Sequence, residues 1–381
     1  MVKQQSVEDY SPPTPQVESV DGDRLSLFCG DPLPDVGSAV AIDDSDGPRH
    51  LYAVCRRHTG ARRVDAWLPE CPEWVGPGTE IELTGRKAGV EASPGAVLCA
   101  GPELIKPVDG DDLPLWPSAP DWQELSGERS SIQIGAEPID ALSPVCEGGL
   151  NLVIDNSGDS RALASLSRRV AQSSSASSGL VCSRNLELYD TVVGDDFWRI
   201  DAGSSPSSQI AALQLAIALA ATLREQKASL AIVELPQIQW PQSPTPSSPD
   251  RARRDAIADI VGRLGRHLVS VADRRLTSLL WLQMPADAPA VETVVDTLRL
   301  GDVDATIYID DEGRFRPERS SSSADVDGAL ARRRQQYLKT LQLARSADEK
   351  SAIFGDLELS DAQRQARDDV ARLRPVIADA L

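Results

Sequence analysis

The segment LVIDNSGDSRALASL, residues 152–166, has the layout of a phosphate-binding loop but lacks most of the groups that bind phosphate. Apolar residues at 150–154 predict a buried strand, residues 155–162 form a polar loop, and residues 162–170 predict a helix. A P-loop, GxxxxGK(S/T), needs glycines so that backbone N–H groups can surround the phosphates, a lysine for their charge and a hydroxyl for Mg²⁺. At the corresponding positions this chain has Asp155, Ser160, Arg161 and Ala162.

Acidic side chains in the same loop oppose phosphate binding further. Asp155 and Asp159 flank the short residues Asn156, Ser157 and Gly158. A carboxylate about 4 Å from a phosphate oxygen costs on the order of 4 kcal/mol near a protein surface. We therefore expect no ATP hydrolysis, weak or absent binding of ATP, ADP and Mg²⁺, and no metal or other cofactor. A strand, a loop with one glycine and a helix also occur as plain α/β architecture, so other evidence must identify the protein.

Composition limits the classes of partner. The chain has 381 residues, of which 41% are hydrophobic and 25% are charged, which is typical of a soluble globular protein with room for several domains. Its net charge is −19 and no basic face is evident, which argues against direct binding to nucleic acids or anionic membranes. The cysteines are widely spaced without a CxxC pair, so we expect scattered thiols rather than a zinc site or a disulfide framework.

Neither a membrane span nor a secretion signal is predicted. The longest apolar run, residues 210–223, contains Gln214 and is too short to cross a bilayer. The amino-terminal sequence MVKQQSVEDYSPPTPQ has no hydrophobic signal core. We interpret the apolar run as a core helix, and we expect a cytoplasmic protein that is peripheral to a membrane only through a complex.

Changes of pattern divide the chain into five parts. Residues 1–16 are polar and proline-rich, which predicts a disordered arm. Short alternating runs separated by Gly, Pro and Asp over residues 17–100 are typical of a small β-barrel. A linker at 101–130 precedes strands that alternate with helices at 131–324, which predicts a parallel sheet covered by helices. Residues 325–381 are charged and predict a short helical domain.

The same patterns predict individual elements. In the α/β region we expect helices over 210–225 and 251–266, and in the tail we expect a break near 354–359 with an N-cap at Ser360. The strands expected in the barrel are 24–29, 39–42, 51–55 and 80–83, and those in the α/β region are 150–154, 180–182, 230–235, 276–282 and 305–309.

Local phrases in this order resemble the α/β subunit superfamily of F-type and V/A-type rotary ATPases. PGTEIELTGRKAGVEASPGAVL at 77–98 is similar to the end of the family's barrel, and GAEPIDALSPVCEGGLNLVI at 135–154 resembles the start of its nucleotide-binding domain. LTSLLWLQMPADA at 276–288 and LRLGDVDATIYIDDEGRFRP at 298–317 resemble later parts of that domain. The resemblance covers residues 17–317. It implies a RecA-like P-loop α/β domain in a subunit of a hexameric ring that couples ATP to ion transport, as in ATP synthase.

The family's catalytic carboxylates are altered at the positions that this resemblance aligns. Its water-polarising Glu falls in LVCSRNLE, where Ser183, Arg184 and Asn185 stand, although Glu187 would reach that position across a gap. Its Walker B Asp corresponds to Glu234. That glutamate could hold a metal through water, or it could simply cap the end of its strand.

The family's arginine finger is also missing. Its position falls near Asp327, so the finger is lost unless Arg319 replaces it from a shifted loop. Phosphoryl transfer needs the phosphate cradle, the metal ligand, the water-polarising group and the finger together, so we expect no catalytic residue. The residues Asn156, Ser157 and Gly158 resemble the loop of the non-catalytic V/A-type B subunit, which also lacks the lysine.

These observations favour a degenerate, non-catalytic pseudo-ATPase subunit of the F-type α or V/A-type B kind. The resemblance implies that its partner is a homologous catalytic subunit in a hetero-oligomeric ring. The short tail leaves contact with a central stalk open. Two alternatives remain: a scaffold subunit of another assembly, such as a secretion-ATPase-like complex, and an active ATPase in which Arg161 pairs with phosphate.

Overall fold

The computed structural model describes residues 14–44, 47, 49–109, 113–125, 129–158, 160–192, 194–235, 248–283, 298, 303–326 and 328–377. The chain forms two compact units. Unit 1 comprises Met1–Glu91 and Gly101–Trp116, and unit 2 comprises Ala92–Ala100 and Pro117–Leu381. Part of the segment that the sequence assigns to a linker therefore belongs to unit 1. Most of the expected disordered arm, residues 1–13, lies outside the described residues.

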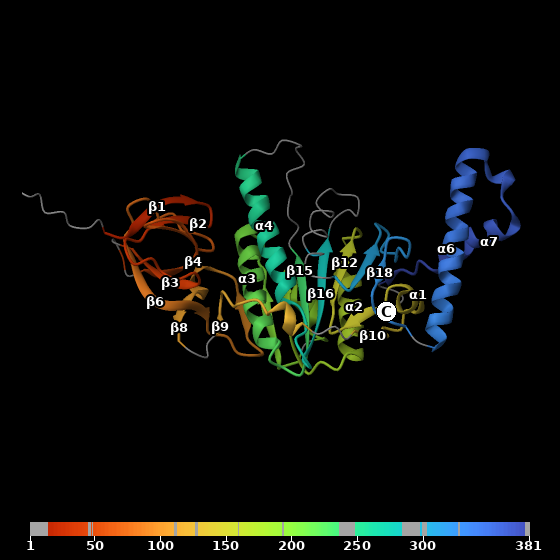
Figure 1. Cartoon of the computed structure of the whole chain (residues 1–381), viewed down its shortest axis with the longest axis horizontal. Coiled ribbons are helices and arrows are strands. Elements are labelled where there is room, and N and C mark those ends of the chain that lie inside the picture. Colours follow the sequence, from red (N-terminus) through yellow and green to blue (C-terminus); the bar gives the residue numbers. More distant parts are fainter. Residues whose placement is uncertain are drawn as a thin grey trace, which may run out of the picture. The chain divides into compact units, whose positions relative to one another are not determined.

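Unit 1 is a small antiparallel β-barrel (Figure 1). Its strand order is β1-β2-β5-β4-β3-β6-β8, with β9 paired to β6, and a bridge between Gln16 and Glu80 connects β1 to the residue before β6. The elements are β1 (Gln16–Asp21), β2 (Arg24–Phe28), β3 (Ser38–Asp43), β4 (His50–Gly60), β5 (Arg63–Trp67), β6 (Ile81–Val90), η1 (Pro102–Leu104), β8 (Lys106–Val108) and β9 (Leu113–Pro114). The four strands expected in this region are confirmed, and β1 and β5 are additional.

The barrel core follows from side-chain alternation along the strands. Leu25 and Leu27 on β2 are fully buried, while their neighbours on the strand are half-buried. Val40 and Ile42 on β3 are fully buried beside them in the same cluster. The alternation along β2 places one face of that strand in the barrel interior, whereas β3 is buried at both faces from Ser38 to Ile42.

Unit 2 contains a sheet in the order β18-β17-β12-β16-β15-β13-β14-β7. All neighbours in it are parallel except β17 and β18. Its strands are β7 (Val97–Cys99), β12 (Leu150–Asp155), β13 (Ser178–Ser183), β14 (Phe197–Asp201), β15 (Ala228–Leu235), β16 (Arg275–Gln283), β17 (Ala305–Ile309) and β18 (Ser321–Ser322). A separate antiparallel pair is formed by β10 (Ser130–Ile132) and β11 (Val145–Glu147). The parallel sheet is confirmed, and β14 and β7 extend it beyond the strands expected from the sequence.

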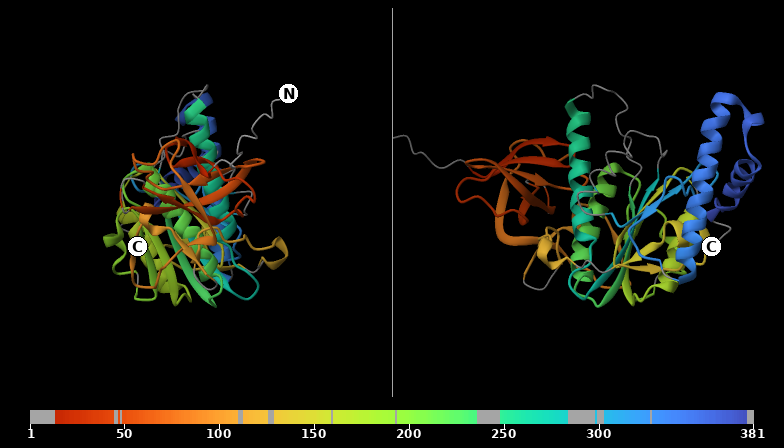
Figure 2. Two further views of the ribbon diagram at one scale, coloured as in Figure 1. Left: turned by 90° about the vertical axis from the view of Figure 1, so that its left-hand side faces the viewer. Right: turned by 45° about the vertical axis from the view of Figure 1, so that its right-hand side comes forward.

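Helices cover both faces of this sheet, as Figures 1 and 2 show. They are α1 (Glu137–Leu142), α2 (Ser160–Ser173), η3 (Leu186–Tyr189), α3 (Pro206–Leu223) and α4 (Ser248–His267), and the tail adds α6 (Gly328–Phe354), η4 (Asp356–Glu358) and α7 (Asp361–Arg372). Leu163 and Leu166 of α2 pack with Val153 and Ile232, and α3 and α4 lie on the other face. The central domain thus has the RecA-like α/β layering that the sequence predicts.

Capping residues explain where two of the helices begin. The Ser205 side chain accepts a hydrogen bond from the backbone N–H of Ser208, and Pro206 occupies the first turn of α3. The expected N-cap at Ser360 is confirmed, because its side chain and that of Gln363 form a capping box at the start of α7. The break before α7 is confirmed as well, and Gly355 adopts φ 82° there.

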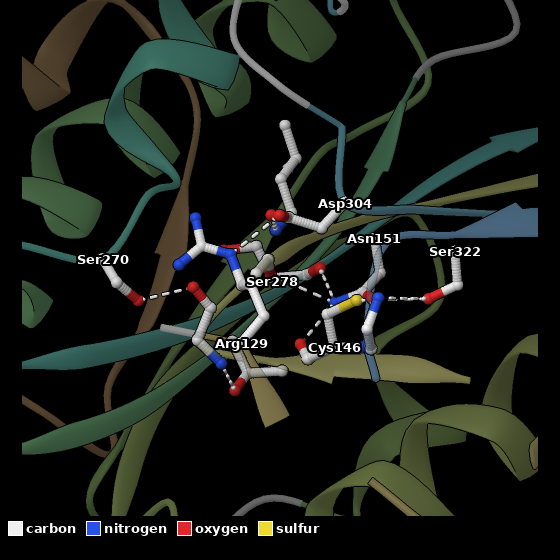
Figure 3. A network of polar contacts seen from close by, with 12 residues as sticks. Arg129, Cys146, Asn151, Ser270, Ser278, Asp304 and Ser322 are labelled. Atoms are coloured by element: carbon white, nitrogen blue, oxygen red, sulfur yellow. Dashed lines mark hydrogen bonds and ion pairs between the residues drawn. The ribbon is translucent and has the colours of Figure 1, made fainter. Parts of the chain in front are cut away.

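A buried polar network holds the amino-terminal end of β12 (Figure 3). The Asn151 amide donates to the backbone carbonyls of Cys146, Gly149 and Ser278 at 3.0 to 3.1 Å, and its oxygen accepts from the Cys146 N–H at 2.7 Å. Asp304 accepts from the Leu150 N–H at 2.8 Å and from Arg129 Nε at 2.7 Å. Buried backbone groups need such partners, so this network fixes the start of the strand whose other end carries the loop.

No helix in the part of the chain that the structure describes is long and apolar enough to cross a membrane. Within the same part, no cluster of His, Cys, Asp and Glu side chains could hold a metal ion. All six cysteines are free thiols.

His267, the last residue of α4, makes the stability of unit 2 depend on pH. Its side chain is 2% exposed, and burial together with Arg224, Arg263 and Arg266 lowers its pKa from 6.5 to about 3. The unfolded chain therefore binds a proton below pH 6.5 that the folded chain does not bind. Stability contributed by neutral His267 is complete above pH 6.5 and falls as the pH drops from 6.5 towards 3.

We predict that His267→Leu reduces this loss of stability in acid. The slope of the free energy of unfolding against pH should decrease by about 1.4 kcal/mol per pH unit between pH 6 and 4, which corresponds to one proton. Urea unfolding of both proteins at several pH values measures the difference. Leu338→Ala, which shortens an exposed apolar side chain of unit 2 and removes no titratable group, is the control and should keep the wild-type slope. Equal slopes for His267→Leu and wild type would contradict the assignment.

Candidate functional site

The candidate site lies at the carboxyl edge of the unit 2 sheet. Asp155, Ser183 and Gln283 are the last residues of β12, β13 and β16, and Glu234 is the penultimate residue of β15. Because parallel strands end at one edge of a sheet, the pairing places these side chains together. The expected loop and the expected Walker B position therefore meet at the same edge.

The loop after β12 is folded onto its own aspartate. Asp155 is fully buried, and its Oδ1 accepts from the Ser157 backbone N–H at 2.8 Å and from the Ser157 hydroxyl at 2.6 Å. The Asn156 N–H donates to the Ile309 carbonyl at 3.0 Å. Gly158 has φ 68°, in the left-handed region that favours glycine. Two backbone donors of the loop, the N–H groups of Asn156 and Ser157, are thus already bonded to the protein.

The first turn of α2 carries the other loop positions. Arg161 is exposed there, while Ala162 is buried in the core beneath the sheet with Leu163. Ser160 is the first residue of the helix, and Asp159 lies outside the described residues. The helix has the placement of a P-loop helix, and apolar packing holds it there.

Glu234 forms an ion pair with Arg184 instead of facing an open site. Its Oε1 accepts from Arg184 Nη2 at 3.1 Å, and its Oε2 accepts from Ser183 Oγ at 2.7 Å and from the Arg184 N–H at 3.2 Å. Arg184 Nη2 also donates to Gln283 Oε1 at 3.2 Å. The Glu234 side chain is 9% exposed and that of Arg184 is 31% exposed. A guanidinium, that of Arg184, therefore lies at a position where the family resemblance leads us to expect a carboxylate, and it pairs with Glu234.

The groups beneath this ion pair are neutral at physiological pH. Burial raises the pKa of the Cys182 thiol, and the charge of Glu234 raises it further. Burial and then Glu234 also raise the pKa of the Tyr189 phenol well above its ordinary value. A thiol or phenol that keeps its proton is a poor nucleophile. Neither group therefore supplies covalent chemistry to the site.

The remaining candidates lie apart from the ion pair. Glu187 is exposed in η3. Arg319 is exposed, and its guanidinium lies 5.4 Å from the centre of the Tyr308 ring on β17. Asp327 lies outside the described residues. Arg319 is thus held on the surface of its own domain by a cation–π contact.

Among the described residues, the groups at this edge that would meet ATP or Mg²⁺ are already bonded within the chain. A triphosphate needs free backbone donors and cations, and Mg²⁺ needs oxygen ligands that are not neutralised by a guanidinium. Here the Ser157 N–H is bonded to Asp155, and both oxygens of Glu234 accept hydrogen bonds from Ser183 and Arg184. Sequence reasoning missed Gln283, although the strand phrase WLQMP marks it as a residue at the end of a strand.

Comparison with known proteins supports the architecture. No family model matches the sequence. The assembled ATPase EscN, from the type III secretion system of enteropathogenic E. coli, has a similar structure, with a TM-score of 0.66 at 12% sequence identity. The match covers 96% of this chain and 94% of EscN. At this identity the similarity shows the fold. The expected order of β-barrel, RecA-like α/β domain and short helical domain is confirmed.

We predict that Arg184→Met destabilises unit 2 by about 1 to 3 kcal/mol, because it leaves the mostly buried Glu234 without its cation. Chemical denaturation measures the change. Adding Glu234→Gln should recover much of the loss, since an uncharged amide needs no counter-ion. Arg168→Met, which removes an exposed guanidinium bonded to Thr191, is the control and should change stability by less than about 0.5 kcal/mol. A loss as small as that of the control would show that the ion pair does not stabilise the fold.

Proposed function

We propose that this chain is a non-catalytic subunit of a ring assembly built on the rotary and secretion ATPase fold. In this proposal it packs beside a homologous catalytic subunit. The observation that carries the proposal is the ion pair between Arg184 and Glu234. Hydrolysis in this fold needs a carboxylate to polarise water and another to hold Mg²⁺, whereas here a guanidinium from one position neutralises the carboxylate at the other.

The phosphate loop supports the same proposal. Asp155 contributes a buried carboxylate at the start of the loop and accepts from the Ser157 N–H at 2.8 Å. A phosphate at this point would meet a negative charge of the protein and would have to displace an existing hydrogen bond. The loop retains its shape through internal bonds, so it can serve the architecture of a subunit interface without binding nucleotide.

A second candidate is a scaffold subunit of another assembly, such as a secretion-ATPase-like complex. The similarity to EscN over nearly the whole chain favours keeping this candidate, because EscN is described as an assembled ATPase of a type III secretion system. The two candidates differ in the partner. An intact P-loop homologue encoded beside this chain would favour the ring with a catalytic subunit, and its absence would favour the scaffold.

We predict that the isolated chain neither turns over ATP nor binds Mg-ATP at micromolar concentrations. The combined variant Asp155→Gly, Ser160→Gly, Arg161→Lys and Ala162→Thr should gain nucleotide binding, because it restores the glycines, the cation and the hydroxyl of the loop. Calorimetric titration with Mg-ATP measures nucleotide binding by the wild type and by this variant.

The same variant without the Asp155→Gly change is the matched control. It should bind far more weakly, because the aspartate still accepts from the loop backbone. Micromolar affinity of the wild type that Arg161→Ala abolishes would contradict the proposal and favour an active site built on Arg161.

We further predict the composition of the native complex. Mass measurement of the complex purified from its source should give a ring that contains both this chain and a homologue with an intact P-loop. A mass that corresponds to this chain with unrelated partners would contradict the non-catalytic ring subunit and support the scaffold. A monomer would contradict both candidates.

A further inference from the structure

After α7 the chain returns to the edge of the unit 2 sheet that carries the candidate site. Residues 374–377, the return segment, pair antiparallel with residues 313–315, which follow β17. The Ile377 N–H donates to the Gly313 carbonyl at 2.9 Å. A two-stranded pair this short is not stable by itself, so side-chain contacts must hold the return segment in place.

A buried side chain and an ion pair anchor the return segment. Ile377 is fully buried in the same core cluster as Phe315 and Leu163 of α2. At the other end of the segment, Arg374 Nη2 donates to Glu318 Oε1 at 3.1 Å, and both side chains are 33% exposed. These anchors are small compared with the core of the domain. The return segment therefore separates from the sheet at a lower free energy than the domain needs to unfold.

Gly313 lies next to both the return segment and the loop of the candidate site. It has φ 74°, which favours glycine. A Cβ atom placed on it would lie 3.9 Å from Ser157 Cβ in the loop and 3.9 Å from Val376 Cγ1 in the return segment. Ser157 and Val376 therefore lie close together over Gly313, and the return segment is a neighbour of the loop.

Backbone hydrogen bonds connect the loop to the return segment through the turn after β17. The Asn156 N–H of the loop donates to the Ile309 carbonyl at 3.0 Å, and Ile309 is bridged to Phe315. The Phe315 N–H donates to the Pro375 carbonyl at 3.0 Å. Departure of the return segment removes this acceptor and uncovers the Phe315 side chain, so the turn that accepts from Asn156 loses its support.

The helical hairpin of α6 and α7 carries the return segment. Near the start of α6, Arg333 pairs with Glu137 of α1, and the Tyr337 hydroxyl donates to the same carboxylate. Further along, Ala344 of α6 packs against Val370 of α7. The hairpin is therefore attached to the sheet at the start of α6 and again through the return segment. A displacement of α7 acts directly on residues that lie beside the loop.

We propose that the return segment is a latch on the loop at 155–158. The latch and the loop open together in one step, and the position of the α6–α7 hairpin controls that step. While the latch is closed, the N–H groups of Asn156 and Ser157 keep their bonds within the chain, and when it opens they become exposed to solvent. The inference rests on contacts within unit 2 and does not depend on the absence of catalysis.

Amide hydrogen exchange of the full wild-type chain, followed by NMR, tests for a single opening step. The loop amides of Asn156 and Ser157 and the latch amides of Phe315 and Ile377 should have opening constants that agree within about threefold. All four should open at least about tenfold more often than Val181 in the buried strand β13. Different constants for loop and latch, or constants equal to that of Val181, would contradict the latch.

A latch variant tests the direction from the return segment to the loop. Ile377→Ala removes the buried anchor, so the loop amides should exchange at least about tenfold faster. Ile353→Ala makes the same change at a side chain of α6 that is 73% exposed, and it should change these rates less than about twofold. Arg374→Met removes the ion pair and is the milder variant, which should accelerate the same amides if Ile377→Ala does not fold. Unchanged loop amides in a folded latch variant would rule the proposal out.

A loop variant tests the reverse direction. Ser157→Ala removes the hydroxyl that bonds to Asp155 at 2.6 Å and leaves the backbone intact. Coupling in one step is reciprocal, so the Phe315 and Ile377 amides should accelerate by the same factor as the Asn156 amide. Acceleration of the Asn156 amide alone would show that the loop opens without the latch, and the proposal would fail.

Discussion

The central strand β12 is held at both ends, and the candidate site depends on that placement. Every residue of the strand is buried, and it lies between β16 and β17, so a shift of one residue would exchange the side chains on the two covered faces of the sheet. At its amino end the Asn151 side chain donates to the Ser278 carbonyl, and the Asp304 carboxylate accepts from the Leu150 N–H. At its carboxyl end the same register sets Asp155 opposite Gln283 and Ile309. The loop therefore starts from a rigid, water-excluded position, and its first carboxylate has to find partners within the chain.

Two carboxylates at this edge accept hydrogen bonds from groups within the chain. A buried carboxylate is stable only with hydrogen-bond donors or a cation nearby. Asp155 takes donors from Ser157, and Glu234 takes Ser183 and Arg184. The helix α2 that follows the loop is held by apolar packing, because Leu163 and Leu166 lie in the core of the domain.

Much of the fold could be predicted because many elements depend on residues that are close together in the sequence. The apolar runs of β12, β15 and β16 and the capping residues of α7 lie within a few positions of one another, and each element formed as expected. Prediction was poorer for short elements. The strand β7 has only the residues Val97–Cys99, and β8 and β9 join the barrel by pairing with β6, far along the chain. Such strands are stable only in the sheet that receives them, so their own residues carry little signal.

The residue types of the loop could be predicted without the fold, because Asp155, Arg161 and the missing glycines and lysine lie at fixed local spacing. The position of Glu234 at the end of a strand could be predicted as well. The pairing of Arg184 with Glu234, 50 positions apart, and the contact with Gln283 became visible only in the folded chain. Pairing between parallel strands is non-local, since each crossover places a strand beside a partner that its own residues do not specify. The order of strands in the sheet therefore determines whether the Arg184 guanidinium faces solvent or the Glu234 carboxylate.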